Sequence, residues 1–167
     1  TNAASFVGLG TVWRCVMGES HARPTKEQFE QIKKLVDQAM KEGALGLSCM
    51  LAAPPDSLAT REELVELCKI VALHGGIFFS HIRNEGTGVF DAILELIEIA
   101  RLAGVTLEII HIKIADQANW GRMNEIVQLI DDARRAGQNV GANLYPYTRG
   151  NNNLATIIPP WAHEGGT

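Results

Sequence analysis

The sequence predicts an α/β fold with a parallel sheet, and more narrowly part of a (β/α)₈ barrel. Short apolar segments typical of buried strands alternate with longer amphipathic segments typical of helices. The predicted strands start near positions 44, 76, 105 and 139, a period of about 30 residues that matches one βα unit. This gives about four units in 167 residues, whereas a complete barrel needs roughly 250 residues.

The predicted elements follow one another without a linker. In chain order they are a strand at 5–13, a helix at 25–43, a strand at 44–49, a helix at 60–74, a strand at 77–81, a helix at 87–103, a strand at 105–111, a helix at 119–136 and a strand at 139–145. Thr25 and Thr60 are expected to cap their helices, because Gln28 and Glu63 stand at the capping-box position three residues later.

Residues 1–167 are therefore interpreted as a single domain, which in a barrel would form about half of it. An open doubly wound sheet is the alternative, but the glycine fingerprint that would favour it is absent. Gly8-Leu9-Gly10 lacks the third glycine of that fingerprint. The tail after Tyr147 is predicted to be loop, with a short helix conceivable at 152–158.

Composition and charge exclude several classes of protein. The chain carries 15 Lys and Arg against 19 Asp and Glu, and a net charge of −4 argues against a nucleic-acid partner. No apolar run approaches the ~20 residues of a membrane span. Three cysteines are too few for a disulfide framework, which favours a reducing compartment and predicts a cytoplasmic location.

Two histidines occupy equivalent places in consecutive units. His81 ends one predicted strand and His111 ends the next, 30 residues later. The carboxyl ends of parallel strands form the active-site edge of a barrel, and neighbouring strands lie ~4.8 Å apart. Both imidazoles could therefore bind one metal ion, although two unrelated histidines bonded to loop backbone are the alternative.

Three further residues at this edge could bind an anionic substrate. Arg83 and Lys113 each follow a histidine by two positions, so they would share its side if the strands continued that far. Each could pair with an anionic group of a substrate, or instead form an ion pair with Glu85 or Asp116. Tyr145 ends the next predicted strand, where its phenol could contact substrate.

Taken together, several motifs resemble the amidohydrolase superfamily and, more narrowly, its D-aminoacylase (N-acyl-D-amino-acid deacylase) family. The motifs are Gly46-Leu47-Ser48, Phe79-Ser80-His81-Ile82-Arg83-Asn84-Glu85, His111-Ile112-Lys113, Ala118-Asn119-Trp120-Gly121-Arg122-Met123 and Tyr145-Pro146-Tyr147-Thr148. The resemblance runs from about Asn2 to Trp161 in the family's order and spacing.

The resemblance implies a zinc-dependent barrel hydrolase of N-acyl-D-amino acids, with one or two metal ions in the complete enzyme and weak zinc binding or none in this fragment. His81 and His111 match the zinc ligands of the family's strands five and six. Lys113 and Tyr145 match residues associated with the substrate carboxylate, and Arg83 matches the basic residue after the strand-five histidine. The family's His-x-His pair, bridging Cys and catalytic Asp have no counterpart in this chain, and its Leu-x-Tyr-x-Pro-Gly stretch reads Leu51-Ala52-Ala53-Pro54-Pro55-Asp56.

The first functional hypothesis is thus that residues 1–167 are a single partial barrel domain of an N-acyl-amino-acid hydrolase, covering roughly strands three to seven and incomplete at both ends. This fragment is expected to be inactive alone and to have no catalytic residue of its own. A cyclic amidase of the dihydroorotase or hydantoinase kind is the second, less favoured because no strand end before His81 offers a lysine ligand. The third is a non-catalytic half-barrel that associates with itself or with complementing barrel segments, because an open sheet exposes strand edges and apolar surface.

Overall fold

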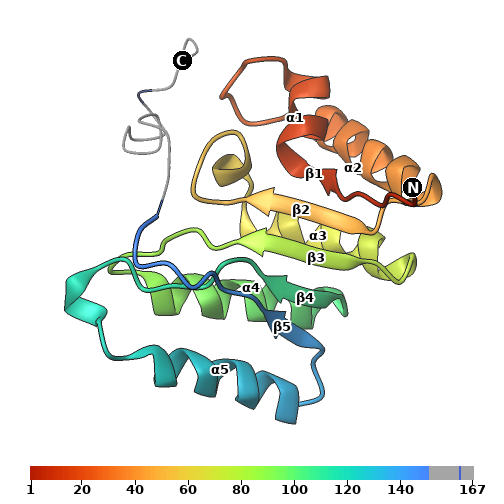
Figure 1. Ribbon diagram of the computed structural model, residues 1–167. Coiled ribbons are helices and arrows are strands. Elements are labelled where there is room, and N and C mark those ends of the chain that lie inside the picture. Colours follow the sequence, from red (N-terminus) through yellow and green to blue (C-terminus); the bar gives the residue numbers. More distant parts are fainter. Residues whose placement is uncertain (151–161, 163–167) are drawn as a thin grey trace.

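The computed structural model describes residues 1–150 and 162, in which strands and helices alternate along the chain (Figure 1). The elements are β1 (Val7–Gly8), α1 (Leu9–Met17), α2 (Lys26–Lys41), β2 (Gly46–Met50), α3 (Arg61–Leu73), β3 (Ile77–His81), α4 (Val89–Ala103), β4 (Thr106–Ile109), α5 (Met123–Arg135) and β5 (Val140–Ala142). Two 3₁₀ helices, η1 (Asp56–Leu58) and η2 (Gln117–Asn119), lie in the loops after β2 and β4. Among these described residues, no helix has the length and apolar character needed to cross a membrane.

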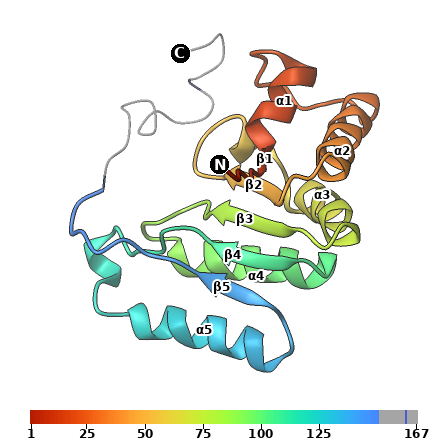
Figure 2. The same ribbon diagram turned by 45° about the vertical axis from the view of Figure 1, so that its right-hand side comes forward.

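The five strands form one parallel sheet in the order β1-β2-β3-β4-β5, so each strand pairs with its neighbours in sequence. Helices α2, α3, α4 and α5 lie along one face of this curved sheet, and the other face carries no helix among the described residues (Figures 1 and 2). A doubly wound sheet would have helices on both faces. The arrangement is that of a partial (β/α)₈ barrel and confirms the predicted fold class.

The hydrophobic core lies between the sheet and these helices. Phe78 in β3 is fully buried toward the helices, whereas Ile77 and Phe79 on either side of it are half-buried on the uncovered face. The helices bury the complementary stripe, for example Leu96 and Ile99 of α4. Burying one such side chain stabilises the fold by about 1.5–3 kcal/mol, which makes this layer the main support of the strand ends.

Both predicted capping boxes are present. The hydroxyl of Thr25 accepts a hydrogen bond from the backbone N–H of Gln28, whose side chain accepts one from the Thr25 N–H. Thr60 and Glu63 repeat the arrangement at the start of α3. Each box satisfies two backbone donors that a helix start otherwise leaves unpaired.

The predicted strand at 5–13 is wrong beyond its first half. β1 is only two residues long, and Leu9 begins a helix instead. Leu9, Val12 and Trp13 are buried together, and their spacing of three and four residues places them on one face of α1. The β-branched and aromatic composition that suggested a strand also suits a short buried helix, so composition alone could not separate the two.

Two strands, β4 and β5, end earlier than predicted at the carboxyl edge of the sheet. β3 spans the predicted 77–81, but β4 ends at Ile109 and β5 at Ala142. His111 and Tyr145 therefore lie in loops just beyond their strands and not at the last strand position. The predicted short helix at 152–158 lies outside the described residues.

Candidate metal centre

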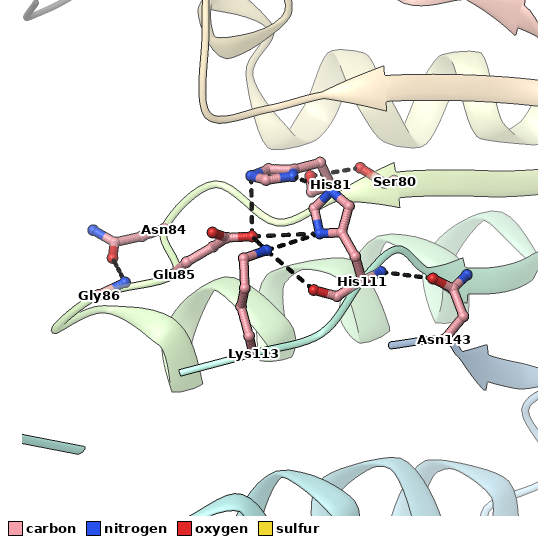
Figure 3. Close-up of polar contacts among 8 residues, drawn as sticks. All are labelled: Ser80, His81, Asn84, Glu85, Gly86, His111, Lys113 and Asn143. Atoms are coloured by element: carbon pink, nitrogen blue, oxygen red, sulfur yellow. Dashed lines mark hydrogen bonds and ion pairs between the residues drawn. The ribbon is translucent and has the colours of Figure 1, made fainter. Parts of the chain in front are cut away.

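His81 and His111 meet at the carboxyl edge of the sheet, as the matched spacing predicts (Figure 3). Nδ1 of His81 lies 2.9 Å from Nε2 of His111, and the ring centroids are 4.5 Å apart at an angle of 70°. His81 is held by β3, whose residues Ile77 to Ser80 pair with Thr106 to Ile109 of β4. The side chain of His81 is 6% exposed and that of His111 is 30% exposed. The pair therefore opens to solvent on the His111 side.

The loop after β4 turns His111 back toward His81. His111 has a φ of +39°, in the left-handed region that side chains other than glycine rarely adopt. Asn143, just after β5, supports this turn, because its side-chain oxygen accepts a hydrogen bond of 2.7 Å from the His111 N–H. The Asn143 backbone carbonyl accepts a second bond, of 2.8 Å, from the N–H of Ile112.

Glu85 is a member of the cluster that sequence reasoning considered only as an ion-pair partner. Its Oε1 lies 3.4 Å from Nε2 of His81 and 3.5 Å from Nδ1 of His111. His81, Glu85 and His111 form a group whose possible ligand atoms all lie within 4.8 Å of one another, in the part of the chain that the structure describes. The sequence did place a carboxylate, Glu85, four positions after His81, which could have indicated a member of the cluster. Whether that side chain turns toward the histidines depends on the geometry of the loop, which the sequence pattern does not reveal.

Lys113 joins the cluster from the same loop as His111. Its Nζ forms an ion pair with Glu85 and lies 3.0 Å from Nδ1 of His111. It also lies 5.4 Å above the ring of Tyr145, so the structure brings together both residues predicted to bind a carboxylate. The ion-pair alternative with Glu85 is thus present in this state.

A cavity of about 350 Å³ opens beside the cluster. Its walls are formed by Met50, His81, Glu85, His111, Lys113, Tyr145, Tyr147, Arg149 and Gly150. Two cationic side chains, Lys113 and Arg149, face one carboxylate there, so the lining has an excess of positive charge that favours an anionic ligand.

Arg83 is not brought to this cavity. Because β3 ends at His81, the alternation that would keep Arg83 on the histidine's side is lost. Its guanidinium binds the carboxylate of Glu95 in α4 through Nε and Nη2, at 3.0 and 3.1 Å. It also donates to the carbonyls of Ser57, at 2.9 Å, and Ala59, at 3.1 Å. A substrate-binding role for Arg83 stays a prediction and requires this network to open.

The donor set suits a divalent metal ion such as zinc. Burial lowers the pKa of His81 to about 4, which keeps its imidazole neutral and able to donate a lone pair at neutral pH. With Zn–N bonds of about 2.0–2.1 Å, two nitrogens on one tetrahedral zinc lie roughly 3.3 Å apart. The 2.9 Å between Nδ1 of His81 and Nε2 of His111 is close to that spacing, so a small ring movement admits the ion.

The two buried cysteines do not add to this set. Burial raises the pKa of the Cys49 thiol well above its usual range, and burial also raises that of Cys68. Both thiols therefore stay protonated in this state and act as small apolar groups of the core.

Comparisons of sequence and structure relate the chain to known enzymes. No protein-family model matches the chain. It is 37% identical to a D-aminoacylase from Alcaligenes xylosoxydans xylosoxydans over 153 residues, which are 92% of this chain and 31% of that enzyme. It is 34% identical to an N-acyl-D-glutamate deacylase from the same organism, over 87% of this chain and 30% of that enzyme.

A solved structure shows the same relationship. The N-acyl-D-glutamate deacylase from Bordetella bronchiseptica superposes with a TM-score of 0.84 at 34% identity, over 87% of this chain and 31% of its own. That enzyme was solved with zinc and a phosphonate inhibitor that mimics the tetrahedral intermediate of its reaction. The chain thus spans about a third of the length of the relatives it matches. Sequence and structure together establish that this chain is homologous to part of the D-aminoacylases and N-acyl-D-glutamate deacylases, within the amidohydrolases.

Proposed function

We propose that this chain forms part of a metal-dependent hydrolase of N-acyl-D-amino acids, in which His81 and His111 bind the metal ion. The observation that carries the proposal is the pair of imidazole nitrogens that face each other at 2.9 Å on the wall of a cationic cavity. Homology to enzymes that act on N-acyl-D-amino acids supports the substrate class.

The two histidines hold the metal ion in a fixed place and donate nitrogen lone pairs to it. His81 is fixed by the β3 strand and by burial, and His111 is fixed through its backbone by Asn143. A divalent metal ion, when bound, supplies Lewis-acid polarisation of the scissile carbonyl and activation of water. Fixed ligands at the ends of two neighbouring βα units, His81 in β3 and His111 in the loop after β4, suit this chemistry because the ion then has a defined place relative to the cavity.

Lys113 and Tyr145 are proposed to bind the carboxylate of the substrate. Lys113 supplies a positive charge within the cavity, and Tyr145 lies next to it with a phenolic hydroxyl that can donate a hydrogen bond. In the described state Lys113 is paired with Glu85, so an incoming carboxylate competes with Glu85 for the ammonium group. Arg149, on the same cavity wall, adds to the attraction for an anion.

The uncovered face of the sheet supports the prediction that the chain associates with itself or with complementing barrel segments. Phe6 and Phe79 stack there with ring centroids 4.9 Å apart, and Ile77 beside them is only half-buried. Light scattering on the purified chain tests this prediction, and a monomer at all accessible concentrations would contradict it.

Two experiments test the proposed function. The first measures zinc binding by the 167-residue chain with His81→Ala and His111→Ala, and both variants are expected to lose binding. The second replaces the matching segment of the Alcaligenes D-aminoacylase by this chain and assays hydrolysis of N-acetyl-D- and N-acetyl-L-amino acids. Selective turnover of the D-substrates, lost with Lys113→Ala, would support the proposal. Zinc affinity unchanged by both histidine variants would refute it.

A further inference from the structure

A single carboxylate oxygen stands at the centre of the cluster. Oε1 of Glu85 contacts Nε2 of His81, Nδ1 of His111 and the ammonium of Lys113 (Figure 3). The Glu85 side chain is only 15% exposed, although it is an acid in a loop. A carboxylate that is largely withdrawn from water needs hydrogen-bond donors or a positive charge beside it. These contacts therefore fix the Glu85 side chain within the cluster.

In each of the two imidazoles, one nitrogen points toward the other ring and the second nitrogen points toward Glu85. Nδ1 of His81 and Nε2 of His111 face each other, and these are the atoms available to a metal ion. The opposite nitrogens of both rings face Glu85. When one nitrogen of an imidazole binds a metal, the other carries the hydrogen and needs an acceptor, which fixes the tautomer and the ring orientation.

Lys113 makes this acceptor necessary at His111. Its Nζ lies 3.0 Å from Nδ1 of His111, and a protonated ammonium can only donate a hydrogen bond. With Nδ1 as acceptor, the hydrogen of a neutral His111 resides on Nε2, which then has no lone pair for a metal. Glu85 offers Lys113 another acceptor and offers Nδ1–H of His111 the one that it requires.

The backbone around Glu85 is held in place independently of the cluster. The carbonyl of Glu85 accepts a hydrogen bond of 2.8 Å from the N–H of Ala115. The side chain of Asn84 accepts bonds of 2.8 and 3.3 Å from the N–H groups of Gly86 and Gly88. The loop after β3 is thereby tied both to itself and to the loop after β4, and the carboxylate of Glu85 starts from a fixed position.

We propose that Glu85 is the positioning residue of this centre: its carboxylate orients the imidazoles of His81 and His111 through their outward nitrogens and gives Lys113 an acceptor other than Nδ1 of His111. The inference rests on the proposed function, because it assigns the inward nitrogens to a metal ion. It makes Glu85 a link between the metal site and the substrate-binding lysine.

The test compares variants of the 167-residue chain in two measurements. Zinc affinity is measured by competition with a chelator for Glu85→Ala, Glu85→Gln and the control Glu98→Ala, whose carboxylate pairs with Arg101 on the surface of α4. Imidazole tautomers are measured from side-chain ¹⁵N shifts without and with zinc. Circular dichroism melting shows whether each variant is folded.

We expect Glu85→Ala to weaken zinc binding about 10–100-fold and Glu85→Gln to weaken it less, since its amide oxygen still accepts a hydrogen bond. Glu98→Ala should bind as the wild type does. In the zinc-loaded wild type the hydrogens should reside on Nε2 of His81 and Nδ1 of His111, and Glu85→Ala should change the tautomers of the unloaded chain.

The outcomes separate this inference from the proposed function. If His81→Ala and His111→Ala abolish zinc binding while Glu85→Ala leaves affinity and tautomers unchanged, Glu85 has no positioning role and the proposed function stands. If Glu85→Gln loses as much affinity as His81→Ala, Glu85 is itself a ligand and the positioning role is wrong. If the histidine variants bind zinc like the wild type, or if neither the wild-type chain nor the chimeric D-aminoacylase that contains it binds zinc at millimolar concentration, both proposals fail.

Discussion

Replacing Arg83 should destabilise the fold, because its guanidinium connects three segments of the chain. It binds Glu95 in α4 and the carbonyls of Ser57 and Ala59 in the loop that contains η1. The Arg83 and Glu95 side chains are 31% and 20% exposed, so water replaces only part of what is lost. Each carbonyl bond contributes about 1 kcal/mol and the partly exposed ion pair at most about 1 kcal/mol.

We therefore expect Arg83→Ala to lower the free energy of unfolding by about 2–3 kcal/mol. Urea denaturation followed by circular dichroism measures this loss. Arg83→Lys should recover less than half of it, since one ammonium cannot replace a planar fork that reaches three partners. Arg101→Ala is the matched control: its ion pair with Glu98 lies on the surface, and the change should stay within about 0.5 kcal/mol.

A double-mutant cycle with Glu95→Gln should give a coupling energy of about 1 kcal/mol between the two side chains. If Arg83→Ala unfolds at the same urea concentration as Arg101→Ala, the structural role assigned to Arg83 is wrong. The predicted binding of substrate by Arg83 would then be favoured over a structural role.

Three further predictions concern the edge of the sheet and the strands below it. Asn143→Ala should destabilise the fold by about 1–2 kcal/mol and speed hydrogen exchange at the His111 amide, because that N–H loses its 2.7 Å acceptor; unchanged exchange would contradict this. Gly46→Ala should lower the free energy of unfolding by roughly 2–4 kcal/mol, since φ is +157° and an added Cβ would lie 1.9 Å from the carbonyl oxygen of Ile77. Urea denaturation measures this loss, and a wild-type-like unfolding curve would show instead that β2 and β3 can move apart to admit the methyl group. Burial raises the pKa of Asp56, so its ionised carboxylate opposes folding above that pKa, and this penalty disappears as the pH falls toward 3.8. The free energy of unfolding of Asp56→Asn should therefore exceed that of the wild type most near pH 7, and the difference should shrink on acidification. A difference that grows in acid would refute this.

That His81 and His111 lie at the same edge of the sheet could be predicted, because this depends on regular structure. Parallel strands with one βα unit between them place equivalent positions side by side, so a separation of 30 residues was sufficient. The capping boxes at Thr25 and Thr60 were predictable for the same reason, since their partners are close in the sequence. The left-handed turn at His111 that brings the two imidazoles together could not be predicted.

The rest of the site depends on where regular structure ends. The direction of Arg83 was not predictable, because alternation holds only within a strand and β3 stops two residues earlier. Glu85 turns inward because its loop is bonded to Ala115, a contact between segments 30 residues apart that no local pattern reveals. The helix at Leu9 was missed because a short apolar run has no length from which to judge its period.

The left-handed backbone of His111 makes this position a conflict between stability and chemistry. Glycine would adopt that conformation without steric cost, so His111→Gly should fold more stably than His111→Ala, yet neither variant keeps an imidazole. A selection for thermal stability alone would therefore tend to remove the residue on which the centre depends. Selection for chemistry has to retain His111 against this steric cost, which is offset by the hydrogen bonds that Asn143 accepts from the N–H groups of His111 and Ile112.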